Sequence, residues 1–223
     1  MFENTWVSNP VCMSNRSTIM TGRMPSAHGG VLNDRSLDWG ANTFVKGFRK
    51  SGYRTGLIGK SHPEHGMSKS VIVASPGEPS GYLPFPAGWD EAEDYERYLD
   101  SLPHAPDDLY GSYHIELSLD HGARATDHHL LWAMKKGAIG EDLLIDMDGD
   151  CPGTDRSTHS RRIYRPPYDE AKHSTTLVAE RTFSFVEKAK LQGKPWLSSC
   201  SFPDAHHPMT PPASGLICTS LKI

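Results

Sequence analysis

The stretch of residues 9–23 constrains the fold of this chain more than any other. It places a cysteine, Cys12, just before a short helical pattern. We expect Ser14 or Asn15 to cap this helix, and Gly22 to end it in the left-handed conformation. The free N–H groups and the positive dipole end of a helix start favour an anion. The stretch therefore predicts a helix whose first turn presents a nucleophile to an anionic ligand.

Arg16 follows Cys12 by one helical turn, so the two side chains share a face of the predicted helix. A guanidinium can hold an oxyanion with two parallel hydrogen bonds, and we expect it to fold back toward Cys12. Ile19 and Met20 are apolar enough to be buried. The residues predict an oxyanion site with a nucleophile at its mouth. The alternative is that Cys12 is a buried structural thiol, as many free cysteines are.

Residues 12–23 resemble the first signature of the sulfatase family, Cys-x-Pro-x-Arg followed by Thr-Gly-Arg, with Ser14 where the family has proline. In that family a dedicated enzyme oxidises the cysteine to formylglycine, whose hydrated form supplies the attacking oxygen and binds the metal. The resemblance implies that Cys12 becomes the nucleophile and a metal ligand, and that Arg16 is catalytic. It also implies a formylglycine-generating enzyme as a partner.

A helix followed by a strand is predicted after this signature. Phe44, Val45 and Phe48 form an apolar stripe, Asn42 or Thr43 can cap the helix, and a glycine at position 52 can close it. The run from position 53 to 59 then predicts a short strand. A helix followed by a strand indicates an α/β layer, and the carboxyl end of a parallel strand usually faces a ligand crevice.

The run from Gly52 to His62 resembles the second sulfatase signature, Gly-Tyr-x-Thr-x-x-x-Gly-Lys-x-His, at every fixed position. The resemblance implies that Lys60 contacts the anionic group of the substrate and neutralises charge on the leaving oxygen. It implies that His62 hydrogen-bonds the formylglycine hydroxyls and moves a proton. On an extended segment, Lys60 and His62 would point to the same side. The alternative is a solvated strand end.

A long helix over about 174–190 and a buried strand over 196–202 are predicted near the carboxyl terminus. The strand delivers the turn after it to the same sheet edge as Lys60. This turn resembles the Pro-His-x-Pro element of the family, whose histidine touches the sulfate. By position that histidine is His206, with His207 as the fallback, and we expect it to be catalytic and to bind substrate.

Three other motifs do not carry a site assignment. Residues 120–122 read Asp-His-Gly, but the corresponding metal element of the family follows the last motif. Residues 146–150 lack the glycine position and the closing glutamate of an EF-hand loop. His128 and His129 are neighbours on a predicted helix over 125–136, so their side chains point in different directions and do not suit one metal.

Composition limits the partners. The 223 residues carry a net charge of -4, and their lysines and arginines form no basic stripe, so nucleic acid is not expected. No apolar run approaches the roughly 20 residues of a membrane span, and no signal peptide opens the chain. The four cysteines show no spacing typical of zinc sites or disulfide frameworks. We expect a small anionic ester as substrate, and a cytoplasmic location by default, with export left open.

The resemblance implies an α/β fold of the alkaline phosphatase-like type, a sandwich with a mostly parallel sheet flanked by helices. We expect residues 1–212 to form a partial catalytic domain, with a loop-rich insertion over about 75–170 and an irregular tail over 213–223. The signature begins almost at once and the tail shows no period, so we expect a fragment truncated at both ends.

The function that the resemblance implies is hydrolysis of a sulfate ester at one divalent cation, usually Ca²⁺, with Mn²⁺ or Mg²⁺ as options. Related enzymes hydrolyse phosphonate monoesters or phosphodiesters. The family's acidic ligands lie upstream of the cysteine and downstream of the histidine motif, so we expect this chain alone to be inactive and marginally folded. The alternatives are a non-catalytic remnant that binds anionic esters, and a cysteine hydrolase that pairs Cys12 with His62.

Overall fold

The computed structural model describes residues 4–33, 37–38, 40–62, 108–118, 125, 127–143, 145, 155–156, 163–204, 206 and 208–211. The elements, in chain order, are α1 (Cys12–Thr21), α2 (Pro25–His28), α3 (Phe44–Lys50), β1 (Arg54–Gly59), β2 (His114–Leu117), α6 (Asp127–Lys135), α7 (Gly140–Leu143), β3 (Asp155–Arg156), β4 (Tyr164–Arg165), a 3-10 helix (Glu170–Lys172), α8 (Ser174–Leu191) and β5 (Trp196–Ser201).

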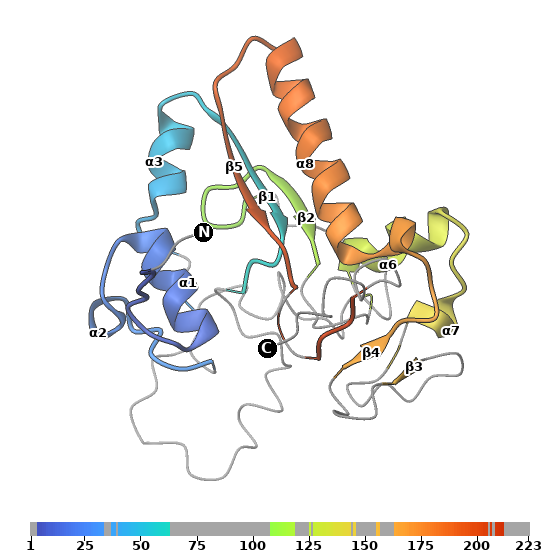
Figure 1. The fold of residues 1–223 in the computed structure, drawn as a ribbon. Helices are drawn as coiled ribbons and strands as arrows, with labels where there is room; N and C mark the ends of the chain where they lie inside the picture. Colours follow the sequence, from blue (N-terminus) through green and yellow to red (C-terminus); the bar gives the residue numbers. More distant parts are fainter. Residues whose placement is uncertain are drawn as a thin grey trace.

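The sheet at the centre has three parallel strands in the order β2-β1-β5. Leu57 of β1 lies level with Ile115 of β2 and with Ser199 of β5. Figure 1 shows α1 and α3 on one side of this sheet and α8 on the other. The predicted α/β fold, with a parallel sheet flanked by helices, is confirmed.

Alternate residues of β1 serve the two faces of the sheet, as the period of a strand requires. Leu57 joins a core cluster with Val45 of α3, whereas Ile58 packs with Val178 and Phe185 of α8. All five side chains are nearly or fully excluded from solvent. The two helices therefore cover opposite faces of the same strand.

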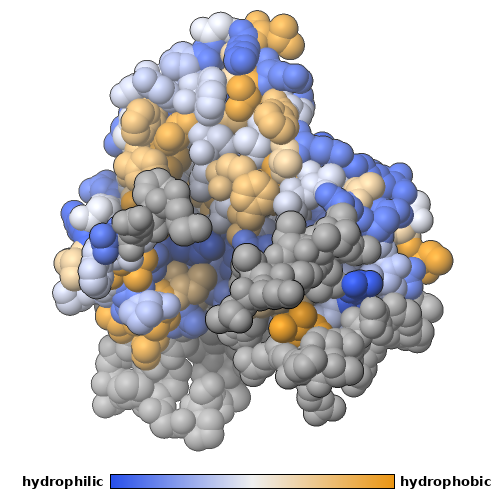
Figure 2. Space-filling model, in the orientation of Figure 1, coloured by the Kyte–Doolittle hydropathy of each residue, from blue (hydrophilic) through white to orange (hydrophobic). Residues whose placement is uncertain are grey.

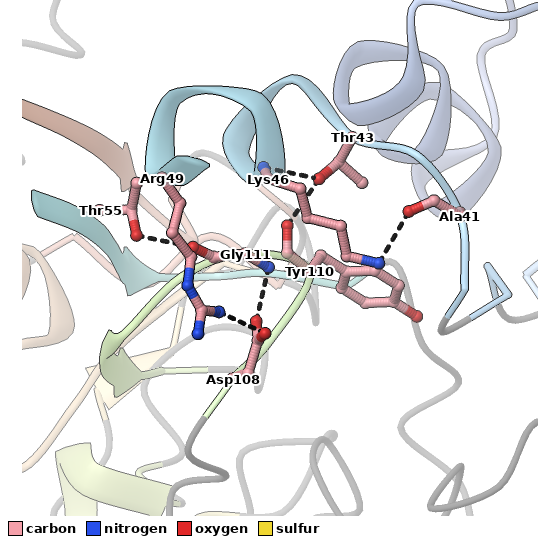
Figure 3. Close-up of polar contacts among 8 residues, drawn as sticks. All are labelled: Ala41, Thr43, Lys46, Arg49, Thr55, Asp108, Tyr110 and Gly111. Atoms are coloured by element: carbon pink, nitrogen blue, oxygen red, sulfur yellow. Dashed lines mark hydrogen bonds and ion pairs between the residues drawn. The ribbon is translucent and has the colours of Figure 1, made fainter. Parts of the chain in front are cut away.

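Buried hydrogen bonds tie α3 to the segment that leads into β2 (Figure 3). The Thr43 hydroxyl accepts from the Lys46 backbone N–H as the helix cap, and donates to the Tyr110 carbonyl at 2.6 Å. The Thr55 hydroxyl of β1 donates to the Gly111 carbonyl, also at 2.6 Å. Buried polar groups with partners hold a segment in one register, so this network fixes β2 beside β1.

A second core cluster lies under α6, α7 and the start of α8. Trp132 of α6, Leu143 of α7, Tyr164 of β4 and Leu177 of α8 are its larger members, and all are buried. The burial predicted for the apolar face of α8 is confirmed at Leu177 and Phe185. The helix predicted over 125–136 is confirmed as α6, on which Met134 is 49% exposed.

Helix α1 begins earlier than the sequence predicted. Its N-cap is Val11, and Ser14 lies inside the helix, fully buried. Asn33, distant in sequence, accepts from the backbone N–H of Met13 at 3.1 Å and so satisfies a group in the first turn. A long-range cap of this kind leaves no local sequence signal. Gly22 ends the helix at φ 66, as predicted.

Two predictions of burial were wrong. Ile19 of α1 is 61% exposed, whereas Met20 beside it is buried as expected. The strand predicted over 196–202 was expected to be buried, but Trp196 at the start of β5 and Phe202 directly after β5 are each 42% exposed. The physical reason for β5 is its position, because it is an edge strand of the described sheet.

Strand β2 was not predicted. It lies within the region expected to be a loop-rich insertion over about 75–170, yet Ile115 and Leu117 of β2 are buried in the central core. Four residues are too short a run for a clear period. The first part of the expected insertion, residues 75–107, the motifs at 120–122 and 146–150, and the tail over 213–223 lie outside the described residues.

Candidate active site

Cys12 is the first residue of the ten-residue helix α1. Two asparagine side chains shape the approach to it. Asn9 accepts from the Val11 N–H at 2.8 Å, and Asn33 accepts from the Met13 N–H at 3.1 Å. The predicted place of the cysteine at the start of a helix is confirmed, and the positive dipole end favours an anionic group there.

The Arg16 guanidinium links three segments. Its Nε donates to Cys12 Sγ at 3.3 Å, which confirms the predicted contact one helical turn away. Its Nη1 donates to the Lys60 carbonyl at 2.8 Å and to the Ser201 hydroxyl at 2.9 Å. Helix α1, the end of β1 and the end of β5 therefore meet at one side chain.

His62 completes the contacts of the thiol. Its Nδ1 lies 3.2 Å from Cys12 Sγ. Its φ is 55°, which is rare for a residue with a side chain, so the chain does not continue as the extended segment that the sequence analysis assumed. The turn out of β1, not strand alternation, brings this imidazole to the sulfur.

Lys60 lies directly after β1 and is only 2% exposed. Its backbone N–H donates to the Ser201 carbonyl at 2.8 Å. The preceding residue, Gly59, has φ 97, and a Cβ there would lie 1.9 Å from the same Ser201 carbonyl. Only glycine allows β1 and β5 to approach this closely at the strand ends, so it fixes the position of Lys60.

His206 lies half-buried on the turn after β5, where its backbone N–H donates to the Pro203 carbonyl at 3.2 Å. The same turn is tied to the start of α8, because the Asp204 carboxylate accepts from the hydroxyls of Thr175 at 2.9 Å and Ser174 at 3.3 Å. These contacts hold the turn at the carboxyl end of the sheet. The role of His206 stays a prediction, and the fallback residue 207 lies outside the described residues.

The described surroundings of Cys12 suit an anion better than a cation. Arg16 donates to the sulfur, and His62 can donate once protonated. Within the part of the chain that the structure describes, no three His, Cys, Asp or Glu side chains cluster closely enough to hold a metal ion. Calcium needs several oxygen ligands, so the described residues do not by themselves fit such an ion.

The adjacent pair on α6 faces two different partners, as expected. His128 Nδ1 accepts from the Leu117 N–H at 3.1 Å, and His129 Nε2 donates to the Lys172 carbonyl at 2.8 Å. Burial lowers the pKa of each to about 4, so both are neutral near pH 7. The two rings thus contact backbone groups of different segments, as their adjacent positions on a helix predict.

Two residues of the site escaped the sequence reasoning. Ser201 binds Arg16 from the last position of β5, and Asn33 caps α1 from a distant loop. Neither belongs to a recognised signature. The signal available for Ser201 was its place at the end of a predicted parallel strand, where ligand-facing residues gather. The sequence offered no comparable signal for Asn33.

Comparison with known proteins gives a family match over most of the chain. Residues 1–214 match the family model described as Sulfatase. The chain is 26% identical over 215 residues to an arylsulfatase of Clostridium perfringens (strain 13 / Type A), covering 95% of this chain and 37% of that protein. It is 33% identical over 97 residues to an arylsulfatase of Hemicentrotus pulcherrimus, covering 40% and 16% respectively.

Among solved structures, the phosphonate monoester hydrolase of Agrobacterium radiobacter is similar with a TM-score of 0.50 and 16% sequence identity. The match covers 93% of this chain and 34% of that one. At this identity the likeness shows the fold alone, which is the expected alkaline phosphatase-like arrangement. The chain thus spans little more than a third of the longer relatives it matches along its length.

No described helix is both long and apolar enough to cross a membrane.

Proposed function

Because this chain belongs to the sulfatase family, we propose that it carries the nucleophile-bearing part of a sulfuric ester hydrolase, with the nucleophile made from Cys12. One observation supports this most directly. The Cys12 sulfur lies 3.3 Å from Arg16 Nε and 3.2 Å from His62 Nδ1, at the start of a helix. A group held there faces both a fixed positive charge and a base, as attack on a tetrahedral sulfur requires.

The surroundings of position 12 fit a formylglycine, because donors and a base already face the side-chain atom that would be replaced. That modification would supply the attacking oxygen. Arg16 would hold an equatorial oxygen of the sulfate, since its guanidinium is fixed by the Lys60 carbonyl and Ser201. His62 would take up or return a proton at Nδ1, within reach of position 12.

Lys60 and His206 complete the proposed site. The Lys60 side chain is almost fully excluded from solvent at the carboxyl end of β1. A charge in such a place acts through a lower effective dielectric than in water, so it can neutralise developing negative charge strongly. His206, on the turn held by Asp204, would contact the sulfate and orient or protonate the leaving group.

Sulfatases generally use a divalent cation, and we propose Ca²⁺ for the whole protein, with Mn²⁺ or Mg²⁺ as options. Its ligands would have to come from outside the described residues. We expect added Ca²⁺ to leave the melting temperature of the 223-residue chain nearly unchanged. A large rise in a thermal melt would show that the chain itself holds the ion.

A second function is a non-catalytic module that binds anionic esters through Arg16, Lys60 and His206. The observation that favours it is the lack of a metal-binding cluster within the described residues. Hydrolysis of phosphonate monoesters or phosphodiesters is the alternative within the same superfamily. Both alternatives keep the same anion-binding groups, so they differ from the main proposal in turnover and substrate rather than in geometry.

Mass spectrometry of the tryptic peptide that contains Cys12 tests the proposal. The chain is produced together with a formylglycine-generating enzyme, and conversion of the thiol appears as a loss of about 18 Da. We expect this loss, and we expect a Cys12→Ala variant to show no activity on 4-nitrophenyl sulfate under any condition. An unmodified thiol would favour the binding module, and turnover by an unmodified thiol would favour a cysteine hydrolase.

Assays of the converted chain with matched sulfate and phenylphosphonate esters then separate the two superfamily activities. The proposal predicts a higher kcat/KM for the sulfate ester wherever turnover is measured. Arg16→Met should lower kcat/KM by about a hundredfold, the scale of losing one donor to a developing oxyanion. A preference for the phosphonate ester would overturn the sulfatase assignment and leave the site intact.

A further inference from the structure

A pocket of about 280 Å³ lies at the end of the sheet opposite to Cys12, where β1 and β2 begin and α8 turns into β5. This is the upper end of the molecule in Figure 1. The side chains that line it are cationic, aromatic or amide-bearing: Tyr53, Arg54, Tyr113, His114, Gln192 and Lys194. None of its described lining residues is acidic. This volume suits a small ion or molecule rather than a drug-sized ligand.

Arg54 is held in place, but its guanidinium keeps N–H donors for a ligand. Its Nη1 donates to the Gln192 side-chain oxygen at 2.7 Å, and its guanidinium carbon lies 5.3 Å from the centre of the Phe185 ring. Its Nε is buried and has no hydrogen-bond partner within the described structure. A guanidinium has five N–H donors, and Gln192 engages one of them, so Arg54 retains donors for an acceptor that enters the pocket.

The pKa of His114 reflects its burial and the positive charge around the pocket. Burial, followed by the positive charges of Arg54, Lys188 and Arg181, lowers its pKa to about 4. The imidazole is therefore neutral near pH 7 and adds a further hydrogen-bonding group without adding charge. A depressed histidine pKa beside several cations is typical of a region of positive potential.

Two features of the surroundings of the pocket disfavour an anion. Helices α3 and α8 both end beside the pocket, and helix carboxyl ends are partly negative. Their last turns, however, carry the cations Arg49, Lys50, Lys188 and Lys190. Glu116 lies 3.7 Å from His114, but its carboxylate also faces Arg181 at 3.8 Å. The charges that oppose an anion are thus already offset by neighbours.

We propose that this pocket binds a small oxyanion, such as sulfate or phosphate, between Arg54 and Lys194. The Arg54 guanidinium offers planar donors, Lys194 adds an exposed ammonium, and Tyr53 and Tyr113 supply aromatic walls. Figure 2 shows blue hydrophilic residues alongside orange apolar ones at this end of the molecule. The site is separate from the one around Cys12 and does not depend on the proposed function.

The test is a titration of the full chain with sodium sulfate, and separately with sodium phosphate, followed by NMR of the histidine ring protons. Sodium chloride at the same ionic strength is the reference. The proposal predicts saturable shifts of the His114 resonance with sulfate and phosphate and none with chloride. It also predicts that the pKa of His114 rises with bound anion, because the anion offsets the charge of Arg54.

Two lysine variants give the matched control. Lys194→Met should weaken the binding seen at His114 by about fivefold, whereas Lys135→Met, exposed on α6 and outside the pocket, should leave it within about twofold. Both positions are exposed, so both variants should fold. Arg16→Met should leave these shifts unchanged. Shifts that never saturate, or that respond equally to the two lysine variants, would overturn the site.

Discussion

The two ends of the parallel sheet hold their arginines differently. At the carboxyl end, the Arg16 guanidinium donates to a sulfur, a backbone carbonyl and a hydroxyl, contributed by α1, the end of β1 and β5. At the amino end, Arg54 donates to the side chain of Gln192, and its Nε is buried without a partner among the described residues. Groups from three segments fix the guanidinium at the carboxyl end in a closed network, whereas Gln192 holds the guanidinium at the amino end and leaves it more N–H donors for a ligand.

This difference indicates two kinds of site. A closed network positions a reacting group within a few tenths of an ångström, which catalysis requires. A site with spare donors binds a mobile ligand and can remain empty without collapse. We therefore expect changes at the carboxyl end to alter stability and geometry together, and changes at the amino end to alter ligand binding with little effect on the fold.

The largest effect should come from two glycines, one at each end of β1. Gly59→Ala would place a Cβ 1.9 Å from the Ser201 carbonyl at φ 97, so we expect it to lower the free energy of unfolding by more than about 4 kcal/mol. Gly52→Ala has φ 87 but meets no atom within 4 Å, and should cost only about 1 to 2 kcal/mol. Urea denaturation measures both. Equal losses of unfolding free energy in Gly59→Ala and Gly52→Ala would contradict the contrast between the two ends of the sheet.

The next effect compares the arginines. Arg16→Met leaves the Lys60 carbonyl and the Ser201 hydroxyl without their charged donor, so we expect a loss of about 2 to 3 kcal/mol in unfolding free energy. Arg54→Met keeps an apolar stem against Phe185 and should cost less than about 1 kcal/mol. Urea denaturation of the two variants under the same conditions measures both losses. A larger loss of unfolding free energy in Arg54→Met than in Arg16→Met would contradict the prediction.

A smaller effect concerns pH. The pKa of His114 falls to about 4 in the folded chain, below its ordinary value, so the unfolded chain binds more protons between about pH 6.5 and 4. The stability from burying this neutral imidazole is therefore present above pH 6.5 and lost as pH falls toward 4. His114→Gln should lose less stability than the unsubstituted chain between pH 7 and 5 in urea denaturation. Equal losses of stability in the variant and in the unsubstituted chain would contradict the lowered pKa of His114.

Much of the carboxyl end could be predicted from the sequence. The spacing of Cys12 and Arg16 predicted their contact, and the strand before Lys60 predicted its place at the sheet edge. The family resemblance implied that His62 lies near Cys12, which the 3.2 Å contact confirms, whereas the extended segment expected to align His62 with Lys60 is not formed, because His62 has φ 55. Local patterns carry this information because the residues of each signature are close in sequence.

The amino end and the supporting contacts could not be predicted in this way. Ser201 reaches Arg16 only because β5 pairs with β1, and strand pairing is a property of the folded chain. Arg54 and Lys194 meet at the pocket for the same reason, and no motif links them. Strand β2 was missed because its four residues are too few for a period to show.

The central claim is that separate segments close around Cys12, and alkylation with iodoacetamide tests it most directly. Cys12 is half-buried and Cys200 is exposed, so exposure alone predicts that Cys200 reacts first. The account predicts instead that in the folded, unconverted chain at pH 7 mass spectrometry finds Cys12 alkylated faster. This advantage should disappear in Arg16→Met, in His62→Ala and in denatured chain. A Cys12 that reacts more slowly than Cys200, unaffected by either variant, would contradict the account.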